Sequence, residues 1–244
     1  MLSKNQISYI KSLHQKKFRQ MYGKFLVEGA KNVQELLHST WVTDVVYCTD
    51  AIENYANKEL AIEQVTELEL QKISTLSTPD RAVAVAQIAV AKELVLPSAD
   101  KFYLLLDGIN DPGNLGAIIR IADWFGWHSI YLSENCVDVY NPKTVSAAKG
   151  SLFRTHCQYC DLLELIGRSN MPVYGAVLNG ANVYSQKFNS GGLLLIGSEA
   201  NGISENLEPL ITNRISIPAF GNAESLNAAV ATGILVSEIM RRNQ

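Results

Sequence analysis

The sequence has few of the features that mark membrane-spanning, secreted or disordered proteins. Charged residues make up only 18% of its 244 positions, and it contains four cysteines and seven prolines. The longest apolar stretches, such as Ala82–Ala91, are too short to span a bilayer. The first six residues lead into polar sequence instead of the apolar core of a secretory signal. Four free thiols fit a reducing compartment, so we expect a cytoplasmic protein that does not bind membranes.

The usual sequence patterns of metal sites and phosphate-binding loops are also missing. Cys157 and Cys160 have the spacing of half a zinc site, but no second cysteine pair or histidine cluster completes it. The segment Gly113–Gly116 matches neither Gly-x-Gly-x-x-Gly nor a phosphate-binding loop that ends in Lys-Ser or Lys-Thr. These absences argue against metalloenzymes, dehydrogenases and NTPases, and we expect no metal.

Charge is nearly balanced overall but not along the chain. Lysine and arginine number 21 against 24 acids, which gives a net charge of −3. The stretch from Met1 to Lys24 nevertheless carries six basic residues and no acid. Such a cluster either meets the phosphates of a nucleic acid or forms the solvated face of a helix, and spacing alone favours the solvated face.

A polar linker, Pro97–Asp100, divides the sequence into two predicted domains. With 47% hydrophobic residues, the chain is long enough to build a core in each. Residues 1–96 mix helical and strand patterns and predict a small α/β domain. Its expected helices are Ile7–Phe18 and Ala30–Leu37, and its expected strands are Lys24–Val27, Asp44–Cys48 and Val83–Ile88.

Residues 97–244 repeat a pattern of apolar strand, glycine-bearing turn and helix. This alternation predicts an α/β domain with a mostly parallel sheet covered by helices. Ligands of such sheets bind beyond the carboxyl ends of the strands, where three polar clusters fall. The expected strands are Phe102–Leu106, Ser129–Leu132, Val173–Val177, Leu193–Ile196 and Arg214–Ile217, and the expected helices are Asn114–Trp124 and about Ser225–Arg241.

The first cluster is Asp111–Arg120. Its apolar residues recur three and four positions apart and form the buried stripe of a helix. Asn114 stands where the amino-terminal cap of that helix is expected, and position alone favours this structural role. Arg120 projects away from the centre of the stripe, as a surface cation or as a functional group.

The second cluster, Gly197–Gly202, follows an apolar strand directly. Glycines at a strand end let a ligand approach the backbone, and Glu199 would stand at the mouth of the crevice. A plain turn with an exposed glutamate explains the segment equally well.

The third cluster, Ile217–Ala231, leads into the closing helix. Ser225 is a candidate cap for this helix, and Asn227 is an unusual choice for its first turn. The helix is apolar almost all round, which predicts burial in the core or in a subunit interface.

These three clusters, in this order, resemble the three motifs of the SpoU or TrmH branch of the SPOUT RNA methyltransferases. The resemblance rests on the asparagine and arginine six residues apart, on Gly-Ser-Glu-x-x-Gly, and on Ile-Pro followed by Ser-Leu-Asn. It covers about residues 101–242. Residues 1–96 resemble, more weakly, the RNA substrate-binding domain that is often fused to these enzymes, through Lys24–Gly29 and Val83–Val85.

The resemblance implies S-adenosylmethionine-dependent methylation of a ribose 2′-hydroxyl in RNA. It also implies a deep trefoil knot in the catalytic domain, residues 97–244, and a homodimer formed through that domain. Periodicity alone would have predicted an ordinary doubly wound sheet, because knots are nearly absent from proteins. By motif match the catalytic residues are Arg120, Asn114, Glu199, Ser225 and Asn227.

The role of Arg120 has two interpretations. A guanidinium with a pKa above about 12 is a poor base, so stabilising the oxyanion or clamping a phosphate is physically easier than removing a proton. The family is associated with a base role, which would need strong perturbation by neighbours. For the cofactor, the matching positions are Gly197, Ile217, Leu226 and, with core packing as an even alternative, Leu178.

Three functional hypotheses remain distinct at the level of sequence. The leading one is a ribose 2′-O-methyltransferase; its substrate RNA is either ribosomal RNA, towards which the two-domain layout leans, or transfer RNA. The second is a non-catalytic RNA-binding or ribosome-assembly protein of the same fold, against which the presence of every motif residue speaks. The third, methylation of a base nitrogen, is disfavoured by Ser225–Asn227.

Overall fold

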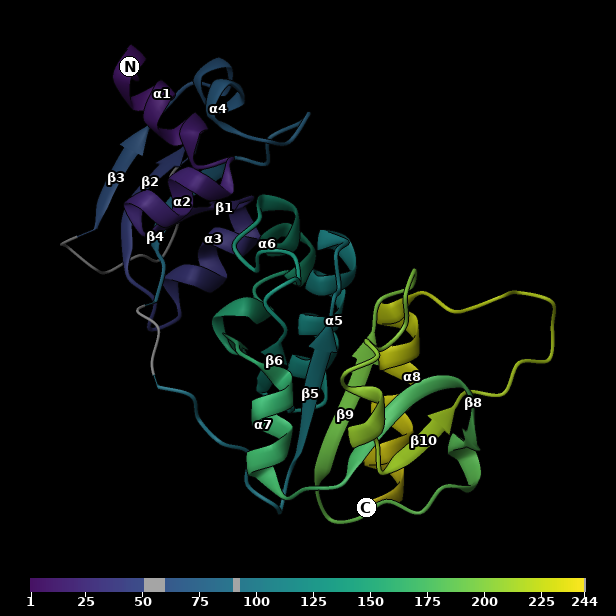
Figure 1. The fold of residues 1–244 in the computed structure, drawn as a ribbon. Helices are drawn as coiled ribbons and strands as arrows, with labels where there is room; N and C mark the ends of the chain where they lie inside the picture. The colour runs from purple at the N-terminus through teal and green to yellow at the C-terminus, as the bar shows by residue number, and fades with distance from the viewer. Residues whose placement is uncertain (51–59, 90–92, 244) are drawn as a thin grey trace. The chain divides into compact units, whose positions relative to one another are not determined.

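A computed structural model describes residues 1–50, 60–89 and 93–243 (Figure 1). The chain forms two compact units. Unit 1 comprises Met1–Val90 and Asp138–Arg154, and unit 2 comprises Ala91–Val137 and Thr155–Gln244. Within the described ranges, no helix is long and apolar enough to cross a membrane.

Unit 1 is built on a four-stranded sheet with the strand order β1-β4-β2-β3. Strand β4 pairs antiparallel with both β1 and β2, and β3 pairs parallel with β2. The sheet forms because β4 is a run of small β-branched and alanine residues that is buried at five of its six positions. The strands are β1 (Lys24–Glu28), β2 (Thr43–Cys48), β3 (Ala61–Gln64) and β4 (Ala82–Gln87), and the helices are α1 (Lys4–Ser12), α2 (Lys16–Tyr22), α3 (Ala30–Leu37), α4 (Glu67–Ile73), α6 (Pro142–Ala148) and the 3₁₀ turn η1 (Ser151–Phe153).

The single helix predicted for Ile7–Phe18 is wrong, because the chain breaks between α1 and α2. The carbonyl groups of Leu13 and His14, at the break, accept hydrogen bonds from the Arg19 guanidinium at 3.0 and 2.9 Å. Arg19 is only 2% exposed and forms an ion pair with Asp138 at 2.6 Å. The break is therefore stabilised by a buried side chain that the helical periodicity does not reveal.

The basic amino-terminal stretch is less basic on the surface than its sequence indicates. Arg19 is buried, and Lys24 forms an ion pair with Asp44. The remaining cations of the stretch, Lys4, Lys11, Lys16 and Lys17, are exposed. The count of six positive charges therefore overstates what a polyanion would meet.

The segment Asp138–Arg154 packs within unit 1 although it follows a strand of unit 2 in the sequence. The ring of Tyr140 lies 4.8 Å from that of Phe25, and the ring of Phe153 lies 5.9 Å from that of Trp41, between centroids. Together with the ion pair between Arg19 and Asp138, these contacts tie the segment to the amino-terminal fold.

Unit 2 contains a six-stranded sheet with the order β10-β8-β9-β5-β6-β7, and every pairing in it is parallel. The predicted parallel α/β architecture is confirmed. Its strands are β5 (Phe102–Asp107), β6 (Ser129–Leu132), β7 (His156–Tyr159), β8 (Val173–Asn182), β9 (Gly192–Gly197) and β10 (Asn213–Ser216), and its helices are α5 (Pro112–Trp124), α7 (Leu162–Ser169), α8 (Ala228–Arg242) and the 3₁₀ turns η2 (Val183–Ser185) and η3 (Glu208–Leu210).

The central strands β5 and β9 are buried on both faces. Leu105 and Leu195 pack in one cluster with Leu165 of α7. Because side chains alternate along a strand, their neighbours point to the opposite face, where α5 and α8 lie (Figure 1). Helices α5 and α8 pack against each other, and Gly233 of α8 faces Ile121 of α5. The leucine runs predicted as strands are thus covered from both sides.

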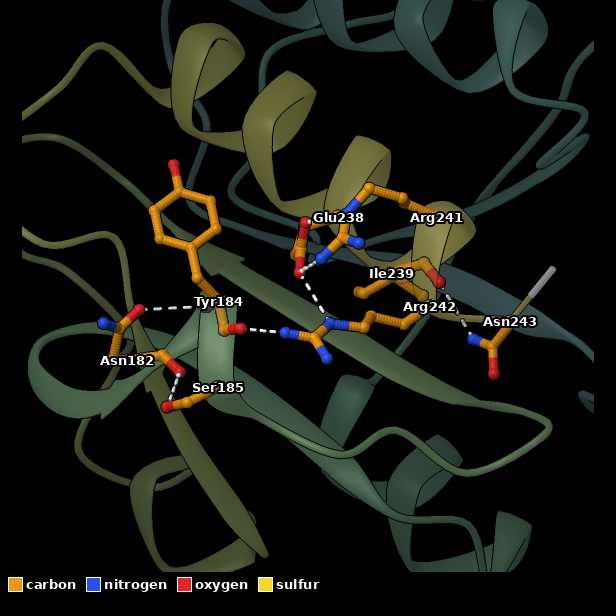
Figure 2. A network of polar contacts seen from close by, with 8 residues as sticks. All are labelled: Asn182, Tyr184, Ser185, Glu238, Ile239, Arg241, Arg242 and Asn243. Atoms are coloured by element: carbon orange, nitrogen blue, oxygen red, sulfur yellow. Dashed lines mark hydrogen bonds and ion pairs between the residues drawn. The ribbon is translucent and has the colours of Figure 1, made fainter.

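The carboxyl end of α8 is fixed by a polar network (Figure 2). The Glu238 carboxylate accepts hydrogen bonds from Arg241 at 2.6 and 2.8 Å and from Arg242 at 2.9 Å. Arg242 also donates to the backbone carbonyl of Tyr184 in η2. The hydrogen bonds from Arg241, followed by those from Arg242, lower the pKa of Glu238 to about 2.

Candidate active site

The three motif clusters meet at the carboxyl edge of the unit 2 sheet. Strand β5 ends at Asp107, shortly before α5, and the neighbouring strand β9 ends at Gly197. The amino terminus of α8 comes to the same place, because the backbone N–H of Ala228 donates to Glu199 Oε1 at 3.1 Å. Segments far apart in the sequence therefore form one site.

Asn114, Glu199 and Asn227, one residue from each cluster, form a chain of hydrogen bonds. Asn227 Nδ2 donates to Asn114 Oδ1 at 2.7 Å, and Asn114 Nδ2 donates to Glu199 Oε1. A carboxylate accepts hydrogen bonds and has none to donate, so Glu199 fixes the direction of the whole chain. The arrangement leaves each asparagine with a defined orientation.

The expectation that Asn114 caps α5 is wrong. The cap is Asp111, whose Oδ1 accepts from the backbone N–H of Asn114 at 2.7 Å, and Pro112 occupies the first turn. Asp is a strong cap, and proline at the first helical position has the required φ angle in advance. The helix therefore starts earlier than expected, and the side chain of Asn114 is free for the site.

The predicted start of the closing helix is also wrong, because α8 begins at Ala228 and Ser225 does not cap it. Asn227 is the cap, and its Oδ1 accepts from the N–H groups of Ala229 and Val230 at 3.0 and 3.2 Å. The amide of Asn227 thus has two functions at once. Its oxygen caps the helix, and its nitrogen holds Asn114.

Two of the sequence-predicted catalytic residues stand outside this network. Arg120 and Ser225 are both exposed. In the described part of the chain, neither forms a side-chain hydrogen bond or ion pair. The guanidinium of Arg120 is therefore available to an anionic ligand.

The positions expected for the cofactor differ in their surroundings. The loop after Gly197 folds back so closely that only glycine fits at this position. A Cβ on Gly197 would lie 2.1 Å from the carbonyl carbon of Gly202. Leu178 lies in an excursion of β8, because the pairing with β10 jumps from Gly175 to Ala181. Its side chain is 72% exposed, and its carbonyl accepts from Ser216, the residue before Ile217, at 2.8 Å.

These surroundings fit S-adenosylmethionine. Leucine is normally buried, yet Leu178 and Leu226 are exposed, the latter by 45%. Exposed apolar side chains of this kind suit an adenine ring, which has flat apolar faces and a polar edge. The ligand carries no phosphate, so a glycine-rich phosphate loop is not needed.

Cys157 and Cys160, the pair with the spacing of half a zinc site, are partly buried free thiols. Burial raises the pKa of Cys157 to about 12 and that of Cys160 to about 11, so both thiols stay protonated at neutral pH. Among the residues whose placement is described, no group of three or more His, Cys, Asp or Glu side chains is arranged to hold a metal ion.

Sequence reasoning did not single out Asp107 and Ser204, which lie next to the site. The Asp107 carboxylate, 5% exposed, accepts hydrogen bonds through Oδ2 from the backbone N–H and the hydroxyl of Ser204 at 2.7 and 2.5 Å. The only signal in the sequence is an acid at the end of an apolar strand, and such an acid has many structural explanations.

Comparisons with known proteins agree with this geometry. A profile of the SpoU rRNA Methylase family matches residues 101–237, and one of the MRM3-like substrate binding domain matches residues 4–84. The chain is 34% identical to the Bacillus subtilis 23S rRNA (guanosine(2553)-2′-O)-methyltransferase RlmP over 235 residues, which is 93% of this chain and 92% of that protein. The chain therefore belongs to the SpoU rRNA methylase family.

Solved structures give the same result. A TrmH-family RNA methyltransferase structure from Porphyromonas gingivalis is similar with a TM-score of 0.89 and 37% identity, over 99% of both chains. The SpoU methyltransferase AviRb from Streptomyces viridochromogenes, solved in complex with the cofactor AdoMet, is similar with a TM-score of 0.85 and 26% identity, over 98% of both chains.

Proposed function

We propose that this protein transfers the methyl group of S-adenosylmethionine to a ribose 2′-hydroxyl in ribosomal RNA. The observation that carries the proposal is the hydrogen-bond chain from Asn227 through Asn114 to Glu199. It joins one residue of each family motif at the edge of the sheet where ligands bind. Family membership over most of the chain and the ribosomal RNA substrate of RlmP support the same conclusion.

The cofactor would be held by Gly197, Ile217, Leu226 and Leu178. The sulfonium of the cofactor supplies an already activated methyl group. The protein must therefore align the ribose 2′-oxygen with that methyl group and provide for the loss of the hydroxyl proton. We assign Asn114, Glu199 and Asn227 to the arrangement of the site. Ser225 stands two residues before Asn227 and is exposed, so we assign its hydroxyl to contact with the substrate.

Arg120 carries the electrostatic part of the proposal. Its guanidinium is exposed and has no acid partner in the described residues, so it is available to an RNA phosphate or a developing oxyanion. We assign it this stabilising role, since a guanidinium is a poor proton acceptor.

Residues 1–96 are assigned to RNA binding and residues 97–244 to catalysis. The match to the MRM3-like substrate binding domain supports the first assignment. Lys11, Lys16 and Lys17 are exposed and have no acidic partner among the described side chains, so they can contact phosphates. Within the range 97–244, segment Asp138–Arg154 is the exception, because it packs in unit 1 with the amino-terminal residues.

We further propose that the catalytic domain dimerises through α5 and α8, and that its chain is knotted as in the family it belongs to. Trp124 of α5 is 84% exposed and Val230 of α8 is 51% exposed, so each of these two helices leaves an apolar side chain that a partner subunit would cover. A hollow of 430 Å³ is lined by Phe125, Tyr184, Gly233, Ile234, Ser237 and Glu238.

The proposal is tested by mapping ribose methylation across total RNA from cells with and without the protein. We expect the loss of one 2′-O-methyl group in ribosomal RNA, and restoration by the wild-type gene but not by Arg120→Ala. A lost mark in transfer RNA would correct the substrate. Unchanged ribose methylation in all RNA would refute the assigned activity. A ribosomal RNA substrate also fits the expected cytoplasmic location.

A further inference from the structure

Asp107 occupies the junction between two of the three motifs. It is the last residue of β5, and its Cα pairs with that of Gly197, the last residue of β9. Four residues further along its own chain stands Asp111, the cap that sets the start of α5 and hence the position of Asn114. The backbone of Asp107 therefore leads directly to one partner of the Asn114–Glu199 pair.

The carboxylate of Asp107 holds the loop that carries the other partner. This loop, Ser198–Ser204, is closed on itself by hydrogen bonds between the backbones of Ser198 and Gly202 at 3.1 and 2.9 Å. Its far end is fixed to Asp107 Oδ2 through both the N–H and the hydroxyl of Ser204. Glu199 lies within this closed loop, so its location depends on both ends of the loop.

We propose that Asp107 is a positioning residue for methyl transfer, which sets the location of Glu199 relative to Asn114 through Ser204. Its backbone leads into the segment that carries Asn114, and its side chain makes two hydrogen bonds to Ser204 of the loop that carries Glu199. Both donors bind the same oxygen, so the role requires an acceptor at Oδ2 and not a proton to exchange. The inference rests on the function proposed above, because Glu199 is assigned to the site there.

This role makes a prediction that separates positioning from proton transfer. Asp107→Asn keeps an oxygen that can accept from Ser204, whereas Asp107→Ala removes it. We expect Asp107→Ala to lower kcat about tenfold or more and Asp107→Asn to stay within about threefold of wild type. The control is Asp161→Ala, which removes an aspartate that accepts from two N–H groups at the start of α7, two strands away, and should leave kcat unchanged.

The second part of the test uses the double variant with Glu199→Ala. If Asp107 acts through Glu199, adding Asp107→Ala to Glu199→Ala should cause no further loss of kcat. Multiplied losses would overturn the proposal, and so would an Asp107→Asn variant as slow as Asp107→Ala or an Asp107→Ala variant as fast as wild type.

A measurement independent of turnover keeps the two proposals distinguishable. Hydrogen exchange of the peptide covering Ser198–Ser204 should be faster in Asp107→Ala than in wild type and unchanged in Asp107→Asn. If Glu199→Ala retains full activity, the role assigned to Glu199 fails, and the exchange result alone decides whether Asp107 holds the loop. Unchanged exchange in Asp107→Ala would refute the inference.

Discussion

Asn227→Asp is the substitution that tests the hydrogen-bond chain most cleanly. The carboxylate of an aspartate can still accept from the N–H groups of Ala229 and Val230, and Asp is a cap at least as good as Asn. It cannot donate to Asn114 Oδ1, which now receives a hydrogen bond from Asn227 Nδ2 at 2.7 Å. The change therefore removes the hydrogen bond to Asn114 and leaves the helix cap in place.

The magnitude follows from the single hydrogen bond that the substitution removes. A net hydrogen bond contributes about 1 kcal/mol, and two oxygens that face each other add repulsion. We expect kcat to fall about 10-fold to 100-fold, which corresponds to roughly 1.4–2.8 kcal/mol in the activation free energy. Because the cap remains, the melting temperature should change by less than about 2 °C.

Asn227→Ala removes both functions and gives the comparison. It should lose a similar factor in kcat and in addition about 1 kcal/mol of the free energy of unfolding, because α8 loses its cap. Asn141→Asp is the matched control, since Asn141 caps α6 by the same kind of bond to Lys143 N–H at 3.0 Å. The assay is methyl transfer from S-adenosylmethionine to RNA, followed with a thermal melt of each variant. Normal turnover in Asn227→Asp would show that the hydrogen bond from Asn227 to Asn114 is not needed for methyl transfer.

Three further outcomes are expected. Arg120→Ala and Arg120→Lys should both abolish methyl transfer and leave the circular dichroism spectrum unchanged. Lysine should fail as well because an ammonium cannot reproduce the planar guanidinium. Near-normal turnover of either variant would contradict the role assigned to Arg120. Trp124→Glu should yield a folded monomer in sedimentation, because it places a charge in the proposed interface. Leu163→Glu, at an exposed leucine of α7, is the control and should not change the oligomeric state. A wild-type protein that is monomeric and fully active would disprove the dimer. In the folded protein the pKa of Glu238 is lowered from 4.5 to about 2. The ionised carboxylate therefore stabilises the fold fully above pH 4.5, and this contribution is lost as the pH falls towards 2. Between pH 6 and pH 3, wild type should therefore lose about 1 kcal/mol more unfolding free energy than Glu238→Gln, after solvent screening near the surface, and equal losses would contradict this.

The parallel sheet was predictable because its central strands are continuous runs of apolar residues in the sequence. Phe102–Leu106 and Leu193–Ile196 were predicted within one residue of β5 and β9 at each end. Strands buried on both faces need apolar residues at successive positions, and few other structures need them. Local sequence therefore contained enough information for the centre of unit 2.

The boundaries of the helices depended on contacts that local sequence does not contain. The break after α1 is stabilised by Arg19, whose partner Asp138 is 119 residues away. The end of strand β8 was also missed, because its pairing with β10 resumes at Ala181 after an excursion around Leu178. Nothing in the composition of Asp138–Arg154 marks it as part of unit 1.

The sequence predicted three of the residues that meet at the candidate site, but not the hydrogen-bond network that joins them. The three motifs identified Asn114, Glu199 and Asn227 by resemblance. Reasoning from position alone assigned Asn114 to a helix cap, because hydrogen bonds over 85 and 113 residues cannot be inferred from spacing. Asp107 was missed for the same reason, since its partner Ser204 lies 97 residues further on.

The most direct test of the account is to identify the atom that receives the methyl group. Purified protein is incubated with S-adenosylmethionine and unmethylated ribosomal RNA, and the product is digested and analysed by mass spectrometry. A 2′-O-methyl ribose blocks alkaline cleavage of the adjacent phosphodiester, because the 2′-oxygen is the attacking group. We predict one such alkali-resistant dinucleotide with wild type and none with Arg120→Ala. A methyl group on a base, or no transfer to RNA at all, would contradict the account.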